Sequence, residues 1–445
     1  MQKARYAAAA ATAAAGLAAS VSGAHAAGFA IKEQSPTAQG AAFAGATAEA
    51  ADVTYMFFNP AALSRQSGTQ GATALSLVAP TSQPETARGE TASGTPITGG
   101  DGGSDISDDA LAPAFYGMTS VTQDVKLGVG INAPFGLETS YDDGWVGRYH
   151  ALNSELATIN INPTVSYEPI DGVALGAGLQ AQYITAELTN AVDFGSIGAA
   201  QGIPFATPTQ NDGRAEVEGD DWGFGFTLGV LLEPREGTRV GVGYRSEVEH
   251  ELTGDVDFSG GGQVRSALAR NNAFADTGAE AEVTTPDILS VGAYQDLTEE
   301  LAVMGEFQYT FWSDFDQLNV RFDNATPPSR TEEDWDNSWF AALGVKYDAT
   351  ENLALRTGVA YDESPIPDAT RTPRIPGSDR TWLSFGADYS PYPWLGVKAS
   401  YTYIFADSAS LNLDATDPGN QSRGDLSADF DNHVNIATFS AVLRF

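Results

Sequence analysis

Few residues of this 445-residue chain could do chemistry. Three basic residues, Arg245, Arg356 and Lys398, lie in segments of alternating character, each on the face opposite the large apolar side chains. Alternate residues of a strand point to opposite sides, so we expect these three cations to point inward. There they could bind a carboxylate of a substrate, or they could pair with an acid of the same sheet such as Glu247.

Catalysis and metal binding find little support in the residue types. Three histidines follow the N-terminal leader, His150, His250 and His433, and none belongs to a recognisable nucleophile motif. Their scattered spacing is not that of a metal site, and the chain has no cysteine for a thiolate or a disulfide. We therefore expect no enzyme, no metal and no cofactor.

The N-terminus is typical of an exported protein. Lys3 and Arg5 precede an alanine-rich run over residues 7–19, which is followed by Ala24-His25-Ala26. A charged start, a short apolar stretch and small residues at the cleavage position predict a signal peptide over residues 1–26. No later run reaches the roughly 18 apolar residues that a transmembrane helix needs.

The acidic balance of the chain excludes one class of partner. The formal net charge is −35, which repels phosphate backbones, so we expect no nucleic-acid binding. We interpret the acids as solvated loop surface; contact with lipopolysaccharide through divalent cations is the alternative.

Apolar residues alternate with small or polar residues along most of the chain. Over 125–132, 221–230 and 395–405 every second residue is apolar, and a period of two indicates strands with one apolar face. We predict about fourteen strands, near 71–80, 111–121, 125–134, 155–168, 172–187, 221–233, 238–252, 283–295, 300–315, 337–348, 351–363, 380–390, 394–406 and 432–445.

Short and long connections largely alternate between these strands. The long ones are polar and include 81–110, 188–220, 253–282 and 407–431. This asymmetry is typical of an outer-membrane barrel, whereas a soluble β-sandwich would not alternate its loop lengths so regularly. Closure of the sheet satisfies every backbone group in hydrocarbon. The final strand ends on Phe445, which resembles the signal that the outer-membrane assembly machinery binds.

Residues 27–70 do not have the pattern of a barrel strand. They are rich in alanine and glycine, and Asn59-Pro60 interrupts any regular element. Fourteen strands enclose a lumen too wide for their own side chains to fill. The segment is therefore either a small plug, which we call the hatch, or a mobile tail ahead of a barrel domain over residues 71–445.

An ordered set of motifs resembles the FadL-like family, the long-chain fatty-acid transporters of the Gram-negative outer membrane. The resemblance covers nearly the whole mature chain, with gaps in the outer loops. It rests on Ala27-Gly28-Phe29, Gly40, Ala44-Gly45, Asn59-Pro60-Ala61, Trp222-Gly223-Phe224-Gly225, Tyr244-Arg245-Ser246-Glu247-Val248, Trp312-Ser313, Arg356-Thr357-Gly358, Asp362-Glu363-Ser364-Pro365-Ile366-Pro367, Ile375-Pro376 and Asp379-Arg380.

The resemblance implies an all-β, transmembrane antiparallel barrel of about fourteen strands, closed by a hatch and working as a monomer. A hydrophobic substrate would be caught at the outer loops and then held in an apolar pocket. Phe29 would reach into that pocket, and Asn59, Pro60 and Ala61 would shape the hatch. An inward kink of the third strand at Pro134, Phe135 and Gly136 would open a lateral exit.

Two features leave the substrate open. Pro134 cannot donate to a ladder, which favours the kink, although it could simply end the strand. Family members can carry basic groups in the lumen, but this chain has Tyr183-Ile184-Thr185 and Asp336-Asn337-Ser338 at the corresponding places. We therefore expect passive uptake of long-chain fatty acids or similar molecules. The alternatives are a channel for hydrocarbons or aromatics, and a polar diffusion porin, which would lack a hatch.

Overall fold

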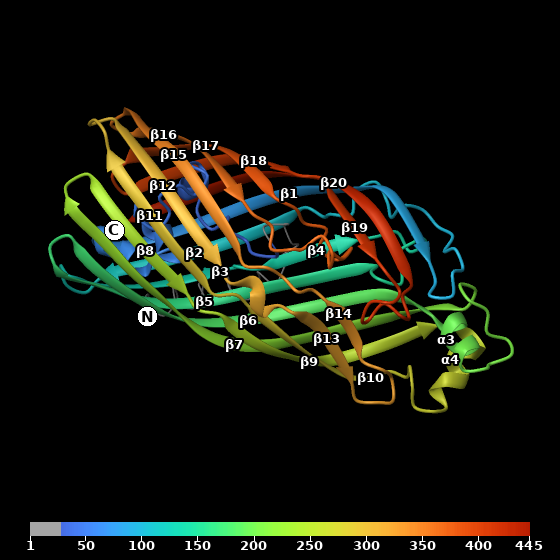
Figure 1. Ribbon diagram of the computed structural model, residues 1–445. Coiled ribbons are helices and arrows are strands. Elements are labelled where there is room, and N and C mark those ends of the chain that lie inside the picture. Colours follow the sequence, from blue (N-terminus) through green and yellow to red (C-terminus); the bar gives the residue numbers. More distant parts are fainter. Residues whose placement is uncertain (1–27) are drawn as a thin grey trace.

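The computed structural model describes residues 28–445, so the predicted signal peptide lies outside the described residues. One antiparallel sheet closes on itself as a barrel of fourteen strands (Figure 1). No helix within residues 28–445 is long and apolar enough to cross a membrane. The hatch contains α2 (Pro36–Gln39), η1 (Val53–Phe57) and η2 (Pro60–Arg65).

The barrel begins with long strands that flank an interrupted one. The first seven segments are β1 (Thr69–Glu90), β2 (Ala110–Ser120), β3 (Val125–Asn132), β4 (Gly136–Ser140), β5 (Asn153–Ile170), β6 (Val173–Asp193) and β7 (Asp212–Arg235). β3 and β4 pair with β5 in turn and together occupy one strand position.

The middle of the barrel contains further interruptions. Its segments are β8 (Thr238–Arg245), β9 (Val248–Gly260), β10 (Thr277–Thr285), β11 (Ile288–Asp296), β12 (Leu301–Thr310), β13 (Gln317–Phe322) and β14 (Ser329–Glu332). β9 continues β8, and β11 continues β10, across breaks of two residues, and β14 is a hairpin partner of β13.

The last strands bring the chain back to its start. They are β15 (Ser338–Thr350), β16 (Leu353–Asp362), β17 (Arg380–Tyr392), β18 (Leu395–Ala406), β19 (Ala409–Leu413) and β20 (Asp425–Arg444). β20 pairs with β1 over nearly its whole length and closes the barrel. Between the strands, the loops contain α3 (Phe194–Ala200), α4 (Gly262–Ala269) and η3 (Trp312–Asp314).

Alternation gives the barrel two different faces. The outward side chains are large, apolar and exposed, among them Leu127, Ile159, Leu175, Phe385 and Phe439. The turns at one end are short, as between β5 and β6, and the loops at the other end are long, as predicted. The predicted number of strands is confirmed, and the pairing of β1 with β20 closes the sheet.

The predicted boundaries were wrong where strands leave the apolar belt. β1 runs to Glu90, β6 to Asp193, and β20 starts at Asp425, so parts of the predicted loops 81–110, 188–220 and 407–431 are strand. The outward residues of these extensions are polar, for example Glu216 and Glu218 on β7. The apolar face that marked the strands is missing there, although the pairing continues.

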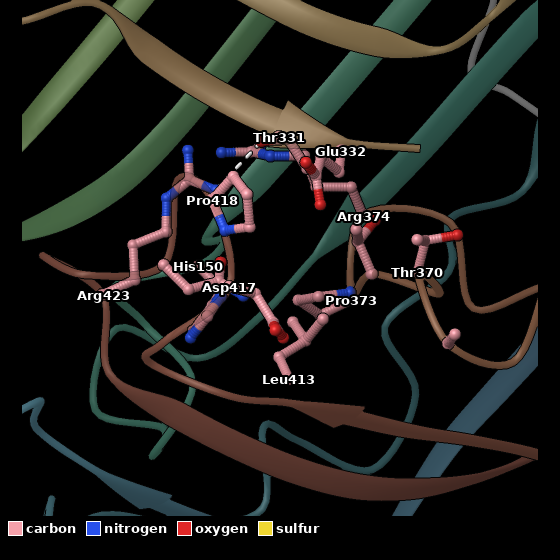
Figure 2. A pocket seen from close by; sticks show the side chains of 13 residues that line it. His150, Thr331, Glu332, Thr370, Pro373, Arg374, Leu413, Asp417, Pro418 and Arg423 are labelled. Atoms are coloured by element: carbon pink, nitrogen blue, oxygen red, sulfur yellow. Dashed lines mark hydrogen bonds between the residues drawn. The ribbon is translucent and has the colours of Figure 1, made fainter. Parts of the chain in front are cut away.

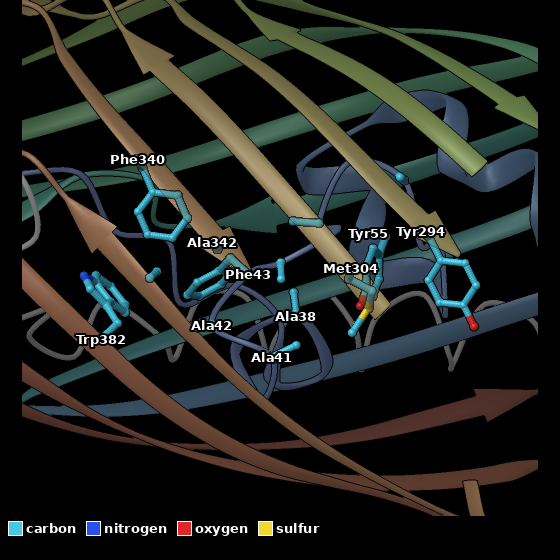
Figure 3. Close-up of a cluster of buried hydrophobic side chains, with 14 of the residues drawn as sticks. Ala38, Ala41, Ala42, Phe43, Tyr55, Tyr294, Met304, Phe340, Ala342 and Trp382 are labelled. Carbon is cyan, nitrogen blue, oxygen red and sulfur yellow. The ribbon is translucent and has the colours of Figure 1, made fainter. Parts of the chain in front are cut away.

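The hatch fills the lumen beside the short-turn end. Its alanines and Phe43 pack in one buried cluster with Met304, Phe340 and Trp382 of the wall (Figure 3). Close approach needs inward glycines on the wall: a Cβ added at Gly358 would lie 2.1 Å from the Ala41 carbonyl oxygen. A Cβ at Gly241 or Gly176 would collide with hatch backbone in the same way.

Candidate functional site

The side chain of Phe29 lies at the centre of a group of aromatic rings. Its ring centroid is 4.8 Å from that of Trp312 and 5.8–5.9 Å from those of Phe135, Phe315 and Trp335. We call these four rings the aromatic box. Phe29 is only 1 % exposed, so it occupies the box itself. A hydrophobic molecule that enters the box must displace this ring.

Glycine is required next to Phe29. Gly28 has a φ of +65°, and an added Cβ would lie 2.7 Å from the Trp335 ring and 2.8 Å from the Trp312 ring. The chain can therefore deliver Phe29 into the box only with glycine before it.

The surroundings of the box are apolar. Ile184 from β6, Leu252 from β9, and Ile366 and Ile375 from the connection between β16 and β17 belong to the same buried cluster. Ile184 is one of the residues where the resemblance led us to look for a cation, and its side chain is fully buried in this cluster. The cluster can thus bind apolar groups through burial alone.

The hatch terminus is joined to the break between β3 and β4. The backbone N–H of Ile31 donates to the Pro134 carbonyl at 2.8 Å, and that of Gly136 donates to the Phe29 carbonyl at 2.9 Å. Ala30 and Phe135 form an isolated antiparallel bridge between these bonds. The predicted kink residues therefore pair with the hatch on the side where β2 would lie, while Phe135 and Gly136 stay bonded to β5 on the other side.

The same break leaves a gap in the hydrogen-bond ladder of the barrel wall, which we call the window. β2 pairs with β3 only from Phe115 to Ser120, and none of the ladders given for β4 includes β2. Towards the long loops, the N–H of Ser140 donates to the Ile106 carbonyl at 2.8 Å, which bounds the window. Beside this window, β2 presents the small inward residues Ala112 and Ala114.

Arg245 points inward, as the alternation predicted, and lines a small cavity next to the break. The cavity has a volume of about 50 Å³ and is shared with Lys32, Phe135 and Tyr244. The guanidinium donates to the side-chain oxygen of Gln180 and to the Phe57 carbonyl. Among the described residues no carboxylate lies within 4.0 Å of it, so Glu247 is not its partner as the alternative had it.

Arg356 and Lys398 also point inward, and both bind hatch carboxylates. Arg356 forms a two-pronged ion pair with Glu49, at 2.7 and 2.8 Å, and contacts Asp388 of the wall at 2.7 Å. Lys398 forms an ion pair with Asp52, which caps η1. In this conformation their charges stabilise the hatch, and their binding to a substrate stays a prediction.

Asn59, Pro60 and Ala61 build a turn of the hatch. The side-chain oxygen of Asn59 accepts from the Ala61 N–H at 2.9 Å and caps η2, and Pro60 occupies the first position of that helix. The Asn59 amide donates to the Thr47 carbonyl at 2.7 Å and to the Val230 carbonyl at 3.0 Å. One side chain thus joins two hatch segments to β7.

Two neighbouring cavities with shared lining residues lie among the long loops. The larger has a volume of about 320 Å³, and its wall is mainly apolar, with Phe258, Phe274, Leu318 and Phe322 among its residues. The smaller has a volume of about 210 Å³ (Figure 2). Leu318 also packs against the cluster that contains the aromatic box, so the larger cavity and the box share a wall.

Arg374 and Arg423, which no sequence pattern indicated, line both outer cavities. Figure 2 shows the two side chains at the smaller cavity. Arg374 lies between two motifs of the resemblance, and Arg423 lies in a predicted loop. Neither segment alternates, so no pattern assigns these side chains to an interior.

A buried acid accompanies the two arginines. Glu333 is 3 % exposed, and its carboxyl group accepts from the indole N–H of Trp335 at 3.1 Å. Burial raises the pKa of Glu333 to about 8, although Arg374, Arg423 and the indole oppose the shift. Burial lowers the pKa of His150, which lines the smaller cavity, to about 3. Both groups are therefore mainly neutral at pH 7.

The histidines lie apart. His250 contacts Gln182 inside the barrel, His150 contacts the Gly424 carbonyl among the long loops, and His433 stacks on Tyr403. Within residues 28–445 no group of three or more His, Cys, Asp or Glu is placed to hold a metal ion.

Comparison with known proteins gives consistent matches in sequence. Residues 17–445 match the model of the family described as outer membrane protein transport protein (OMPP1/FadL/TodX). A protein of Neisseria meningitidis serogroup B with the name of an outer membrane protein is 32 % identical over 95 % of each chain. The long-chain fatty acid transport protein of Escherichia coli K12 is 27 % identical over 87 % of this chain and 89 % of its own.

Solved structures share the fold. The crystal structure of a Pseudomonas aeruginosa FadL homologue has a TM-score of 0.86 at 23 % identity, and covers 94 % of this chain and 99 % of its own. That of the Pseudomonas putida toluene transporter TodX has a TM-score of 0.68 at 17 % identity, with the same coverage.

Proposed function

The chain belongs to the outer membrane transport protein family that includes FadL and TodX, and on that premise we propose passive uptake of long-chain fatty acids or similar hydrophobic molecules. The observation that carries the proposal is the position of Phe29. One hatch residue fills the aromatic box and, through its own carbonyl, holds the break in the third strand.

The first step is capture among the long loops. The larger outer cavity offers an apolar wall of suitable volume for a ligand, since small-molecule pockets begin at roughly 300 Å³. Leu318 lines this cavity and packs against the cluster that contains the aromatic box. An apolar tail would pass from one to the other by moving this side chain.

The second step is exchange of the tail for Phe29. Each buried CH₂ group contributes about 0.8 kcal/mol, and burial of one phenylalanine contributes about 1.5–3 kcal/mol. A tail of a few carbons therefore suffices to replace the ring in the box. No energy source besides this burial is needed, which suits passive transport.

The third step is opening of the wall. When Phe29 leaves the box, the bonds that join residues 29–31 to residues 134–136 break with it. Pro134, Phe135 and Gly136 then lose their bonds to the hatch and keep those to β5, and the window between β2 and β4 becomes the lateral exit. The substrate would leave sideways into the membrane rather than through the hatch.

The three inward cations take different roles in this proposal. Arg245 is free of carboxylates in the described chain and lies beside the break, so it is our candidate for a substrate carboxylate in the lumen. Arg356 and Lys398 hold the hatch closed through Glu49 and Asp52. They would meet a substrate only if the hatch moved away from them.

Uptake of neutral hydrocarbons or aromatics is the second candidate. The rings of the box and the aliphatic side chains around it are apolar, and such a pocket accepts toluene as readily as an acyl chain. The two candidates are separated by an uptake assay with labelled oleate, hexadecane and toluene in cells that lack a transporter of their own. Uptake of oleate alone supports fatty-acid transport, and equal uptake of all three supports a general hydrophobic channel.

A further inference from the structure

Arg374 and Arg423 form a pair of cations at the junction of the two outer cavities. Each lines both cavities, although they lie 49 positions apart in the sequence. Arg374 is 8 % exposed, and Arg423 is partly exposed. Burial, and to a smaller extent repulsion by Arg423, lower the pKa of Arg374 to about 9, so it remains cationic at pH 7.

The hydrogen bonds of both arginines go to neutral groups. Arg374 donates to the Ser154 hydroxyl at 2.8 Å and the Asn153 carbonyl at 3.1 Å. Arg423 donates to the hydroxyls of Thr331 and Ser329, each at 2.9 Å. Among the ion pairs of residues 28–445, none within 4.0 Å includes either arginine. A buried charge without a partner is costly, so this arrangement favours an anion from outside.

The acids around the cavities are engaged elsewhere. Both carboxylate oxygens of Asp193 accept backbone N–H groups of the adjoining loop, and one oxygen of Asp417 accepts from the Asp414 N–H. Glu332 also borders the smaller cavity without an ion pair to either arginine. Glu333 is the acid whose negative charge would act on both arginines. Burial keeps its carboxyl group mainly protonated at pH 7.

Apart from the two arginines, the wall of the larger cavity is mainly apolar. Phe258, Phe274 and Phe322 line the larger cavity together with the two arginines. This combination of one cationic end and one apolar body matches a ligand with a single charged head and a hydrocarbon chain. Alkanes and alcohols carry no charge, so neither class of ligand would give the arginines an ion-pair partner.

We propose that Arg374 and Arg423 bind the carboxylate of a single-chain amphiphile whose tail lies in the larger outer cavity. The inference rests on the proposed function and narrows its substrate class to fatty acids at the point of entry. It places the first recognition of the charge among the outer loops, before the tail reaches the cluster around Phe29. In an otherwise acidic protein, the pair also provides the local attraction that an incoming carboxylate needs.

The test compares ligands that share a chain and differ in the head. Binding of radiolabelled oleate, oleyl alcohol and oleyl phosphate is measured at pH 7 with the full mature chain in lipid nanodiscs. We expect oleate to bind at least about tenfold more tightly than oleyl alcohol, because only the carboxylate forms ion pairs with the two arginines. Equal affinity for oleate and oleyl alcohol overturns the proposal, and tighter binding of oleyl phosphate than of oleate overturns the carboxylate assignment.

Variants of the two arginines test whether these residues cause the preference for oleate over oleyl alcohol. Arg423→Gln, alone and with Arg374→Gln, should remove the preference for oleate and leave the affinity for oleyl alcohol unchanged. Arg423→Lys, which keeps the charge, should retain a part of it. Arg270→Gln removes an exposed arginine of the same outer end that lines neither cavity, and should retain all of it. A preference that survives in Arg423→Gln and in the double variant overturns the proposal.

These measurements distinguish a failure of the outer carboxylate site from a failure of the proposed function. If the preference is absent but uptake of labelled oleate still depends on the chain, only the outer carboxylate site is wrong. If uptake of oleate, hexadecane and toluene is the same with and without the chain, the proposed function itself is wrong.

Discussion

The carbonyl oxygen of Phe29 accepts a hydrogen bond from the backbone N–H of Gly136 at 2.9 Å. The side chain of the same residue fills the aromatic box, so a ligand in the box and the break in the third strand compete for one residue. A ligand that displaces the ring pulls on the bond that holds the break. Substrate binding and opening of the wall are thereby one event in this account.

Phe29→Ala should increase the affinity for oleate, because the ligand no longer has to displace a buried ring whose burial contributes about 1.5–3 kcal/mol. Binding isotherms of the purified variant measure the change. Phe43→Ala is the matched control: it removes a buried hatch phenylalanine that packs on Trp382, away from the box, and should leave the affinity unchanged. Equal affinities of the wild type and Phe29→Ala would count against displacement.

Leu318→Trp should slow uptake and spare capture. Leu318 lines the larger outer cavity and packs on the cluster around the box, so a larger side chain there blocks the passage between them. Oleate bound to the purified variant and oleate taken up by cells are measured in parallel. Leu318→Met keeps the volume and serves as control. Normal uptake by Leu318→Trp would mean that substrate follows another route.

The affinity for oleate should fall as the pH rises from 6.5 to 8.5. Burial raises the pKa of Glu333 to about 8, so Glu333 is neutral in the lower part of this range and anionic in the upper part. The ionised carboxylate then attracts Arg374 and Arg423 in place of the ligand. The pKa of His150, about 3, lies far below this range, whereas that of Arg374, about 9, lies just above it, so a variant must separate the effect of Glu333 from loss of charge on Arg374.

Glu333→Gln cannot ionise, and in this variant the affinity should stay constant over the same range. Dissociation constants measured at intervals of half a pH unit compare the two proteins. The same fall in both would assign it to another group.

Gly358→Val should loosen the hatch. A Cβ at this position would lie 2.1 Å from the Ala41 carbonyl oxygen, and backbone cannot yield as a flexible side chain does. Single-channel conductance in planar bilayers should rise, because the hatch no longer fills the lumen. Gly117→Val, at an outward position whose nearest added contact is 3.9 Å, should conduct as the wild type does. Unchanged conductance of Gly358→Val would show that the hatch tolerates the collision.

Much of the barrel could be predicted because its wall has two different environments. Val125 to Ile131 alternate visibly, and β3 occupies that stretch. The extensions of β1 and β7 were missed because they are polar on the outward face, and only the pairing, which sequence does not display, makes them strands. The interruption after Asn132 was expected from Pro134, but its pairing with Ala30 depends on a contact between segments more than a hundred residues apart.

The site was less accessible to prediction than the fold. Alternation placed Arg245, Arg356 and Lys398 on the inward face, and all three point there. It could not show that Glu49 and Asp52 would meet two of them, because hatch residues have no periodic relation to the wall. Arg374 and Arg423 lie in irregular loops, where side-chain direction is set by tertiary contacts alone.

The most direct test of the coupling between hatch and wall is a disulfide between Ala30→Cys and Phe135→Cys. The two residues are a bridge pair flanked by hydrogen bonds, for which Cα atoms lie about 4.5 Å apart, within disulfide reach. The chain has no other cysteine. A pair at Thr69 and Thr119, which face each other at the short-turn end, is the control.

Uptake of labelled oleate is measured in oxidised cells and again after reduction. Oxidation should abolish uptake by the variant with the Ala30–Phe135 pair, and reduction should restore it. The variant with the Thr69–Thr119 pair should transport in both states. Undiminished uptake with the Ala30–Phe135 disulfide formed would contradict the coupling, because the hatch terminus and the break would then be able to stay joined while substrate passes.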